Sequence, residues 1–199
     1  IATKPAWAFG VLMGKRKTFG NLEGRIPGMT GVKSLAQWTS SQFDPTLCWK
    51  DVEWIRDHWG GKLIIKGVLD VEDARIAAKT GAQAIVVSNH GGRQLDGAPS
   101  SISVLPRIAD AVGNDLEVLF DSGVQSGQDV LRALALGARA CLIGKAYLYG
   151  LGAGGRAGVA KAIDVIRKEL DVSMALTGVS RIDQIDRRVL AEWPSNWPG

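Results

Sequence analysis

Residues 70–88, DVEDARIAAKTGAQAIVVS, are matched 56 residues later by residues 126–144, SGQDVLRALALGARACLIG. Each copy begins with a residue that can cap a helix, Asp70 or Ser126, and has an aspartate three residues further on, a combination typical of a helix start. Each continues through a helical pattern to a glycine suited to a helix end, and then to an apolar run of strand length. The repeat therefore predicts two helix–strand units of one design.

Further strands and helices are predicted around the repeat. Apolar runs at 63–67, 84–88, 117–121 and 140–143 alternate with helical patterns, including 49–59, which Asp44 or Thr46 could cap, and 101–112. Such alternation predicts a parallel α/β sheet with right-handed crossovers, and the repetition favours a (βα)8 barrel over a doubly wound sheet. A complete barrel has eight strands, so the four found here predict half a barrel.

Composition excludes several classes of protein. The chain has 199 residues, of which 46% are apolar and 22% charged, with a formal net charge of +4. This balance is that of a globular domain and excludes a disordered tail or a disulfide-stabilised miniprotein. Cys48 and Cys141 lack metal-binding or redox spacing, which fits a reducing compartment, and we expect no metal site. No apolar run is long enough to span a membrane, and residues 1–10 do not have the pattern of a signal peptide.

The positive charge is concentrated in residues 1–33, which carry six basic residues and only Glu23 as an acid, a net charge of +5. Apolar residues and glycines are interspersed without a clear helical period. One interpretation is a solvated loop that packs its apolar residues on the domain, and another is a segment attracted to anionic lipid headgroups. Basic residues are not clustered elsewhere, so we expect no nucleic-acid partner.

Polar or glycine-rich residues follow all four predicted strands. The first strand ends at Lys66-Gly67, the second runs into SNHGGRQLD at 88–96, the third into DSGVQSG at 121–127, and the fourth ends at Gly144-Lys145. In parallel barrels the catalytic groups gather at the carboxyl ends of the strands. We therefore expect these residues to converge on one face.

His90 and Arg93 are the candidate catalytic pair. His90 follows a buried strand and is flanked by Gly91-Gly92, which would let a ligand approach the backbone. An imidazole can act as a base near neutral pH, and a guanidinium can bind a carboxylate through two hydrogen bonds. His90 could instead have a structural role. Lys66, at the end of the first predicted strand, could simply extend its charged end into water.

The last two strand ends predict a phosphate site. Gly123, Gly127 and Gly144 would expose backbone N–H groups, the helix beginning near Ser126 would offer its positive end, and Lys145 would add a charge. The alternative is that these are ordinary turn and packing glycines. Because phosphate sites of barrels recur after strands seven and eight, the prediction assigns these four strands to the second half of a barrel.

Several motifs together resemble one family. They are IKGV at 65–68, VVSNHGGRQLD at 86–96, DSG at 121–123, LALGA at 134–138 and IGKA at 143–146. These resemble the FMN-dependent family that oxidises 2-hydroxy acids, which includes glycolate oxidase, mandelate dehydrogenase and the bacterial L-lactate dehydrogenases. KPAW at 4–7, FDP at 43–45, WKD at 49–51 and EWIRD at 53–57 are most similar to the bacterial L-lactate dehydrogenases. The resemblance implies a TIM barrel of which this chain holds strands 5–8, with residues 1–199 as part of one FMN-binding domain.

The resemblance implies a role for each candidate residue. His90 would be the base that removes a proton from the substrate, and Arg93 would bind the substrate carboxylate. Lys66 would lie near N1 and O2 of the flavin, where its charge favours the anionic reduced ring, and Ser88 would lie close to it. Asp121 would contact the ribityl hydroxyls. The phosphate end would be lined by Ser122, Gly123, Gln125, Gly144 and Lys145.

Two features depart from the family pattern. The family usually has arginine at the positions of Gln125 and Lys145, so phosphate binding should be weaker or differently shaped here. The amino-terminal half of the barrel, with other flavin- and substrate-binding residues, lies outside these 199 residues. We therefore expect that this chain alone does not turn over substrate.

The predicted function is oxidation of an L-2-hydroxy acid, L-lactate above others, with electrons passing to a quinone or another acceptor. The predicted partners are the missing half-barrel, an anionic membrane surface that binds the variable segment 8–42, and further copies in a homo-oligomer. The predicted location is the cytoplasm, with peripheral attachment to the inner face of the cell membrane. Two alternatives remain: another phosphate-binding barrel enzyme, and a non-catalytic half-barrel whose sheet edges pair with another chain.

Overall fold

A computed structural model describes residues 5–14, 38–39 and 41–191. The chain forms two units, residues 1–48 and residues 49–199. The described part of the first unit contains helix α1 (Pro5–Met13), and most of the predicted segment 8–42 lies outside the described residues. Within the part that is described, the expectation of a loop is wrong for residues 8–13. Proline suits a helix start, and PAWAFGVLM is apolar on all sides, so no polar face produces a visible period.

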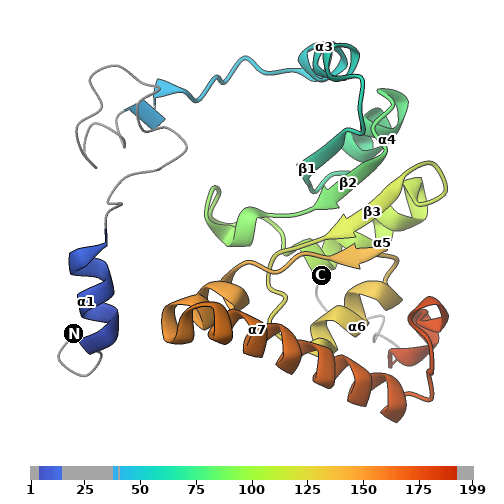
Figure 1. The fold of residues 1–199 in the computed structure, drawn as a ribbon. Coiled ribbons are helices and arrows are strands. Elements are labelled where there is room, and N and C mark those ends of the chain that lie inside the picture. The colour runs from blue at the N-terminus through green and yellow to red at the C-terminus, as the bar shows by residue number, and fades with distance from the viewer. Residues whose placement is uncertain (1–4, 15–37, 40, 192–199) are drawn as a thin grey trace. The chain divides into compact units, whose positions relative to one another are not determined.

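The second unit is a parallel α/β layer (Figure 1). Its four strands pair in the order β1-β2-β3-β4, all parallel, which confirms the predicted alternation. The strands are β1 (Ile64–Val68), β2 (Ala84–Val87), β3 (Glu117–Phe120) and β4 (Ala140–Cys141). The helices are α3 (Trp49–Trp59), α4 (Val71–Lys79), α5 (Ser101–Val112), α6 (Gly127–Ala135) and α7 (Lys145–Leu176), with the 3-10 turns η1 (His90–Gly92), η2 (Ile182–Gln184) and η3 (Arg187–Val189).

One face of the sheet forms the hydrophobic core with α4 and α5. Ile65, Ile85 and Val118 are aligned on three neighbouring strands and pack in this core. Burial of such aliphatic side chains contributes about 1.5–3 kcal/mol each, so this layer supplies much of the stability of the unit. Its fully buried helix residues include Leu105 and Ile108 of α5.

The other face of the sheet is less covered. Side chains alternate between faces along a strand, so Ile64, Lys66, Leu119 and Leu142 point away from the helix-covered core. Ile64 of β1 is 52% exposed and Leu142, the residue after β4, is 42% exposed, both unusual beside a parallel sheet. In a closed barrel this face would line the interior.

The repeat predicted from the sequence has the same helix ends in both copies. Asp70 accepts from the backbone N–H groups of residues 72 and 73 to cap α4, and Ser126 forms a reciprocal capping box with Asp129 at the start of α6. Gly81 and Gly137 follow the two helices with φ of 82° and 105°, a conformation that favours glycine. These predictions are confirmed.

Helix α7 has a break at Gly154 and Gly155, whose backbone angles are not helical. Next to the break, Gly150 and Gly158 lie against each other: a Cβ added at Gly158 would stand 1.9 Å from the carbonyl oxygen of Gly150. The part of α7 after the break packs against α6, where Leu131, Ala135 and Met174 form a second buried cluster with Ile185.

One expectation about the region before the sheet is wrong. Neither Asp44 nor Thr46 caps α3, because Asp44 instead bonds the backbone N–H and hydroxyl of Thr46, three residues before the helix begins. On the apolar side of α3, Trp49 packs against the core, whereas Ile55 is 42% and Trp59 67% exposed. No helix among the described residues has both the length and the apolar character needed to cross a membrane.

Candidate functional site

Three of the predicted residues form a hydrogen-bonded cluster at the carboxyl ends of β1, β2 and β3. Lys66 Nζ lies 2.7 Å from Asp121 Oδ2 and donates to Ser88 Oγ at 2.8 Å. Ser88 is buried and the Asp121 side chain is 16% exposed, whereas the Lys66 side chain is 44% exposed. Lys66 is therefore held at the strand ends and does not simply extend into water.

The charge state of Asp121 follows from this cluster. Burial acts to raise the pKa of the carboxyl group, but hydrogen bonds from Lys66, Ser88 and Ser122, together with the charge of Lys66, outweigh it. The pKa of Asp121 consequently lies below its ordinary value. The site thus presents an ionised carboxylate beside an ammonium group.

The loop after β2 is fixed by side-chain oxygens. Ser88 Oγ accepts from the N–H of His90 at 3.1 Å, and Ser122 Oγ accepts from the N–H groups of Asn89 at 3.2 Å and Gly91 at 3.1 Å. Asn89 Oδ1 also accepts from the N–H groups of Gly91 and Gly92. His90 has a φ of 57°, which is unfavourable for a residue with a side chain, so these bonds maintain a strained turn.

His90 and Arg93 occupy this turn and its end. Both residues are exposed, and neither side chain has a hydrogen bond or ion pair to another residue in the described part of the chain. The turn brings a potential base and a potential carboxylate-binding group close together in the sequence, next to the cluster of Lys66, Ser88 and Asp121. An exposed imidazole and guanidinium without protein partners are available to a ligand.

The ends of β3 and β4 leave backbone groups open. Gly123 has a φ of 87°, and nothing lies within 4 Å of a Cβ built at Gly123 or at Gly144. Gly144 precedes α7 and no side chain caps this helix, so its first N–H groups are available to an anion. Lys145 Nζ lies 3.5 Å from the carbonyl oxygen of Gly91 and so leans toward the His90 turn. Gln125 is exposed.

The predicted contribution of the α6 start to a phosphate site is wrong. Ser126 and Asp129 cap one another, Asp129 Oδ2 also accepts from the N–H of Gln125 at 3.1 Å, and the N–H of Gly127 donates to Glu169 Oε2 at 2.9 Å. These amide groups are already satisfied. Gly127 is instead a packing glycine, because a Cβ there would stand 2.0 Å from the backbone nitrogen of Leu170.

A family model described as FMN-dependent dehydrogenase matches residues 1–192. The chain belongs to the FMN-dependent dehydrogenase family.

Relatives within the FMN-dependent dehydrogenases are about twice as long. An L-lactate dehydrogenase of Caulobacter sp. (strain K31) is 55% identical over 190 residues, which are 95% of this chain and 50% of that protein. An L-lactate dehydrogenase of Actinobacillus pleuropneumoniae serotype 5b (strain L20) is 49% identical over 191 residues, 96% of this chain and 50% of that protein. The chain spans about half the length of these relatives.

Solved structures agree on the fold. An (S)-mandelate dehydrogenase described as a monotopic membrane protein matches with a TM-score of 0.87 and 35% identity, over 96% of this chain and 50% of that one. A mandelate oxidase matches with a TM-score of 0.73 and 42% identity, over 79% of this chain and 46% of that one. The four strands are accordingly the carboxyl-terminal half of a (βα)8 barrel, as the sequence predicted.

FMN is the cofactor indicated for an FMN-dependent dehydrogenase, and the exposed groups of this chain fit part of it. The fit rests on two observations: Asp121 and Lys66 place an ionised acceptor and a cationic donor side by side, and open backbone surrounds Gly123, Gly144 and the uncapped start of α7. These are suitable groups for polyol hydroxyls, a polar ring edge and a phosphate.

Three residues that support the site or its neighbouring helix were not identified from the sequence. Asn89 braces the His90 turn, the buried Ser101 donates to the carbonyl oxygen of Asp121 at 2.7 Å, and Glu169 caps α6 from α7. The SNHGG run contains a signal for Asn89, because asparagine before glycines often forms such a turn. Ser101 and Glu169 act on segments 20 and 42 residues away, and no local pattern reveals such pairs.

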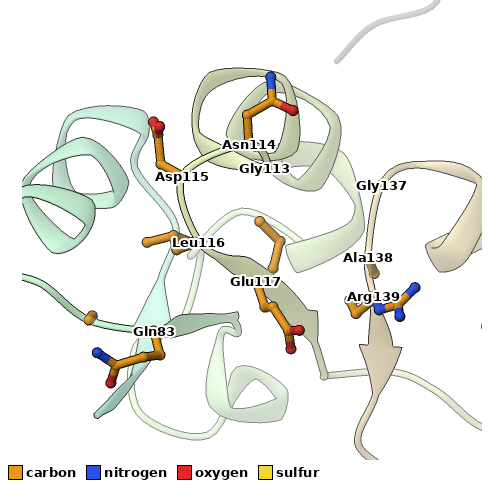
Figure 2. Close-up of a pocket in the computed structure, with 11 residues that line it drawn as sticks. Gln83, Gly113, Asn114, Asp115, Leu116, Glu117, Gly137, Ala138 and Arg139 are labelled. Carbon is orange, nitrogen blue, oxygen red and sulfur yellow. The ribbon is translucent and has the colours of Figure 1, made fainter. Parts of the chain in front are cut away.

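A second surface feature lies at the opposite edge of the sheet, where the strands begin (Figure 2). It is an open depression lined by Gln83, Leu116, Glu117 and Arg139 and by the loop at Gly113 and Asn114. It contains none of the predicted site residues. Because catalytic groups of barrels lie at the carboxyl ends of strands, we assign the site to the Lys66–Asp121 edge.

Proposed function

We propose that the protein oxidises an L-2-hydroxy acid, L-lactate above others, to the 2-oxo acid with FMN as cofactor, together with the other half of the barrel. The observation that carries this proposal is the braced turn that presents His90 and Arg93 beside the cluster of Lys66, Ser88 and Asp121. The names of the L-lactate dehydrogenase relatives support the substrate.

His90 and Arg93 would act directly on the substrate. Oxidation of the C–OH group to C=O removes two electrons and two protons from the substrate. Arg93 would bind the carboxylate and so orient the reacting carbon, and the His90 imidazole would accept one proton. Bound FMN would supply the acceptor for the two electrons and the second proton.

The other predicted residues would hold the cofactor. Lys66 would donate to the polar edge of the ring near Ser88, and Asp121 would accept from ribityl hydroxyls. The phosphate would lie by the open backbone at the ends of β3 and β4 and the start of α7, close to Ser122, Gly123, Gln125, Gly144 and Lys145.

The chain would need a complementary half-barrel for this activity. The exposed inner-face residues Ile64 and Leu142 and the double length of the relatives support such a partner. A (βα)4 unit that covers this face would complete the cofactor and substrate sites, so the chain alone would be inactive. Further copies of the completed barrel would form the homo-oligomer.

A membrane would be the second partner. We place the protein at the inner face of the cell membrane, attached from the cytoplasm, with a quinone or another acceptor taking the electrons. Similarity to a monotopic membrane (S)-mandelate dehydrogenase supports this, as do the exposed Trp7, Phe9, Leu12 and Met13 of α1. The nearby basic residues Lys15, Arg16 and Lys17 lie outside the described residues and enter through the sequence alone.

The function is tested by complementation. The chain is purified alone and together with the half of the Caulobacter L-lactate dehydrogenase that it does not match, and L-lactate-dependent reduction of a dye is measured with the FMN absorbance. Turnover is expected only in the complemented sample. There, His90→Gln should retain FMN but lower kcat by about 10²–10⁴-fold, because the base is lost.

The matched control is His58→Gln, which removes the other, exposed histidine and should leave kcat within about twofold. Robust turnover by the chain alone would overturn the need for a partner half. An FMN-loaded complex that keeps its kcat in His90→Gln would overturn the assigned chemistry.

A further inference from the structure

Ser122 has an unusual backbone for its residue type. Its φ is 80°, and the next residue, Gly123, has a φ of 87°. Left-handed angles suit glycine, so a serine at the first of these positions is strained. A strained non-glycine residue in a site suggests that its side chain has a specific task.

The hydroxyl group of Ser122 uses its full hydrogen-bonding capacity inside the protein. It accepts from the N–H groups of Asn89 at 3.2 Å and Gly91 at 3.1 Å, and it donates to Asp121 Oδ1 at 2.8 Å. A hydroxyl has one donor and two acceptor positions, and all three are occupied. This side chain therefore has no bond left for a phosphate, although its backbone can still line one.

The two accepted bonds enclose His90. Asn89 and Gly91 are its neighbours in the chain, so the Ser122 hydroxyl fixes the peptide group that follows His90 and the one that precedes Asn89, while His90 itself is held at a φ of 57°. Ser88 Oγ fixes the N–H of His90 itself at 3.1 Å. The imidazole has no partner of its own in the described part of the chain, so its position depends on these backbone bonds.

Ser122 is in turn fixed from α5. The hydroxyl of Ser101, which is 2% exposed, donates to the carbonyl oxygen of Asp121 at 2.7 Å and lies 3.4 Å from that of Ser122. The strained turn after β3 is thereby anchored to the core, and β3 is connected through Ser122 to the turn after β2.

We propose that Ser122 is a positioning residue that sets the orientation of His90 through the amide groups of Asn89 and Gly91. The proposal rests on the proposed function for the role of His90, and it gives the Ser122 hydroxyl a task besides the expected place of Ser122 at the phosphate end. The geometry of the turn is nevertheless testable without turnover.

The test compares Ser122→Gly and Ser122→Ala in the 199-residue chain. Both variants lose the hydroxyl, but glycine relieves the backbone strain whereas alanine keeps it. Amide hydrogen exchange of Asn89 should become roughly tenfold faster in both, because its N–H loses its hydrogen bond to Ser122. Exchange of Gly91 should accelerate less, because its N–H also donates to Asn89 Oδ1. The NMR chemical shifts of the His90 ring should change in both, while those of His58, an internal reference, should not.

The control is Ser103→Ala, which removes a hydroxyl that bonds only the carbonyl oxygen of Ser100 on α5 and should leave both readouts unchanged. Exchange and His90 signals that change in Ser122→Ala but not in Ser122→Gly would show that backbone strain alone matters, and would overturn the proposal. So would exchange within twofold of the unsubstituted chain in both variants. None of these results depends on lactate oxidation, so failure here is distinguishable from failure of the proposed function.

Discussion

At the scale of single residues, the charge of Asp121 is determined by the groups around it. Its carboxylate bonds Lys66 and Ser122, and its backbone carbonyl accepts from Ser101. Because the hydrogen bonds and the Lys66 charge outweigh burial, the pKa of Asp121 is lowered, so the ionised form is favoured in the folded protein. A lowered pKa in the folded state contributes stability above the unfolded pKa and loses it as pH falls through the folded value.

The Asp121→Asn variant should therefore be less stable than the parent chain at pH 7. We expect a loss of about 1 kcal/mol, at the lower end for charge-assisted bonds because Lys66 is 44% exposed. The difference should shrink as pH falls below the ordinary pKa of 3.8, because the carboxyl group becomes protonated first in the unfolded chain and then, at lower pH, in the folded chain. Urea unfolding at pH 7, 5 and 3 measures this.

The control for this prediction is Asp115→Asn, a change of the same charge at an exposed position that forms no ion pair in the described part of the chain. It should alter the unfolding free energy by less than about 0.5 kcal/mol at pH 7. A difference between Asp121→Asn and the parent that stays constant from pH 7 to pH 3 would contradict the ion-pair explanation.

Sequence reasoning placed Lys66, Ser88 and Asp121 together because the ends of parallel strands meet at one edge. It did not find the part played by Ser101, since a buried serine at a helix start has no special local pattern. It placed Ser122 at the phosphate end but did not find that the Ser122 hydroxyl accepts hydrogen bonds from the neighbouring turn. A side chain's partners depend on which segments meet in space.

Among the elements, the two repeated helices begin and end as the sequence predicted, but they differ in the elements against which they pack. Asp70 and Ser126 cap α4 and α6 as predicted. The start of α6, however, packs directly on α7, where Gly127 leaves no room for a side chain. Repeat position alone could not show this contact, because the glycine and its neighbour Leu170 are far apart in sequence.

Gly127→Ala should lower the unfolding free energy by about 1–3 kcal/mol, since the added Cβ would stand 2.0 Å from Leu170 N and would force α6 away from α7. Gly152→Ala is the matched control, because nothing lies within 4 Å of a Cβ at that helical position, and it should be neutral or stabilising by up to about 1 kcal/mol. Thermal and urea unfolding measure both. Equal effects of the two substitutions would argue against close packing at Gly127.

For the whole molecule, charge and exposed apolar surface are unevenly distributed. The basic excess lies in residues 1–33, and α1 in the same unit exposes Trp7, Phe9, Leu12 and Met13. The sequence revealed the charge but not the helix, because an apolar pattern on all sides of a helix has no period to detect. Together these features favour binding to an anionic membrane surface.

Replacement of Lys15, Arg16 and Lys17 by glutamine should weaken partition onto liposomes that contain phosphatidylserine by about 100-fold. Each basic residue near an anionic surface contributes about 1 kcal/mol, and the effect should diminish at high salt. The control replaces Lys79, Arg107 and Lys161, which are exposed in the second unit, and should change partition by less than about threefold. Sedimentation with liposomes measures the bound fraction, and equal weakening by both triple variants would point to net charge alone.

The contact between Gly150 and Gly158 makes the break in α7 a rigid corner. Because both residues are glycines, the backbones can touch, and this contact sets the angle between two parts of α7. One part packs on α6, and the first amide groups of the other face the open site. The direction of these amide groups therefore depends on the contact between Gly150 and Gly158, which lies further along the helix. Among natural homologues, we consequently expect cofactor affinity to vary with the small residues near the break in α7, which do not contact the cofactor. It should also vary with the polar residues that would contact the phosphate.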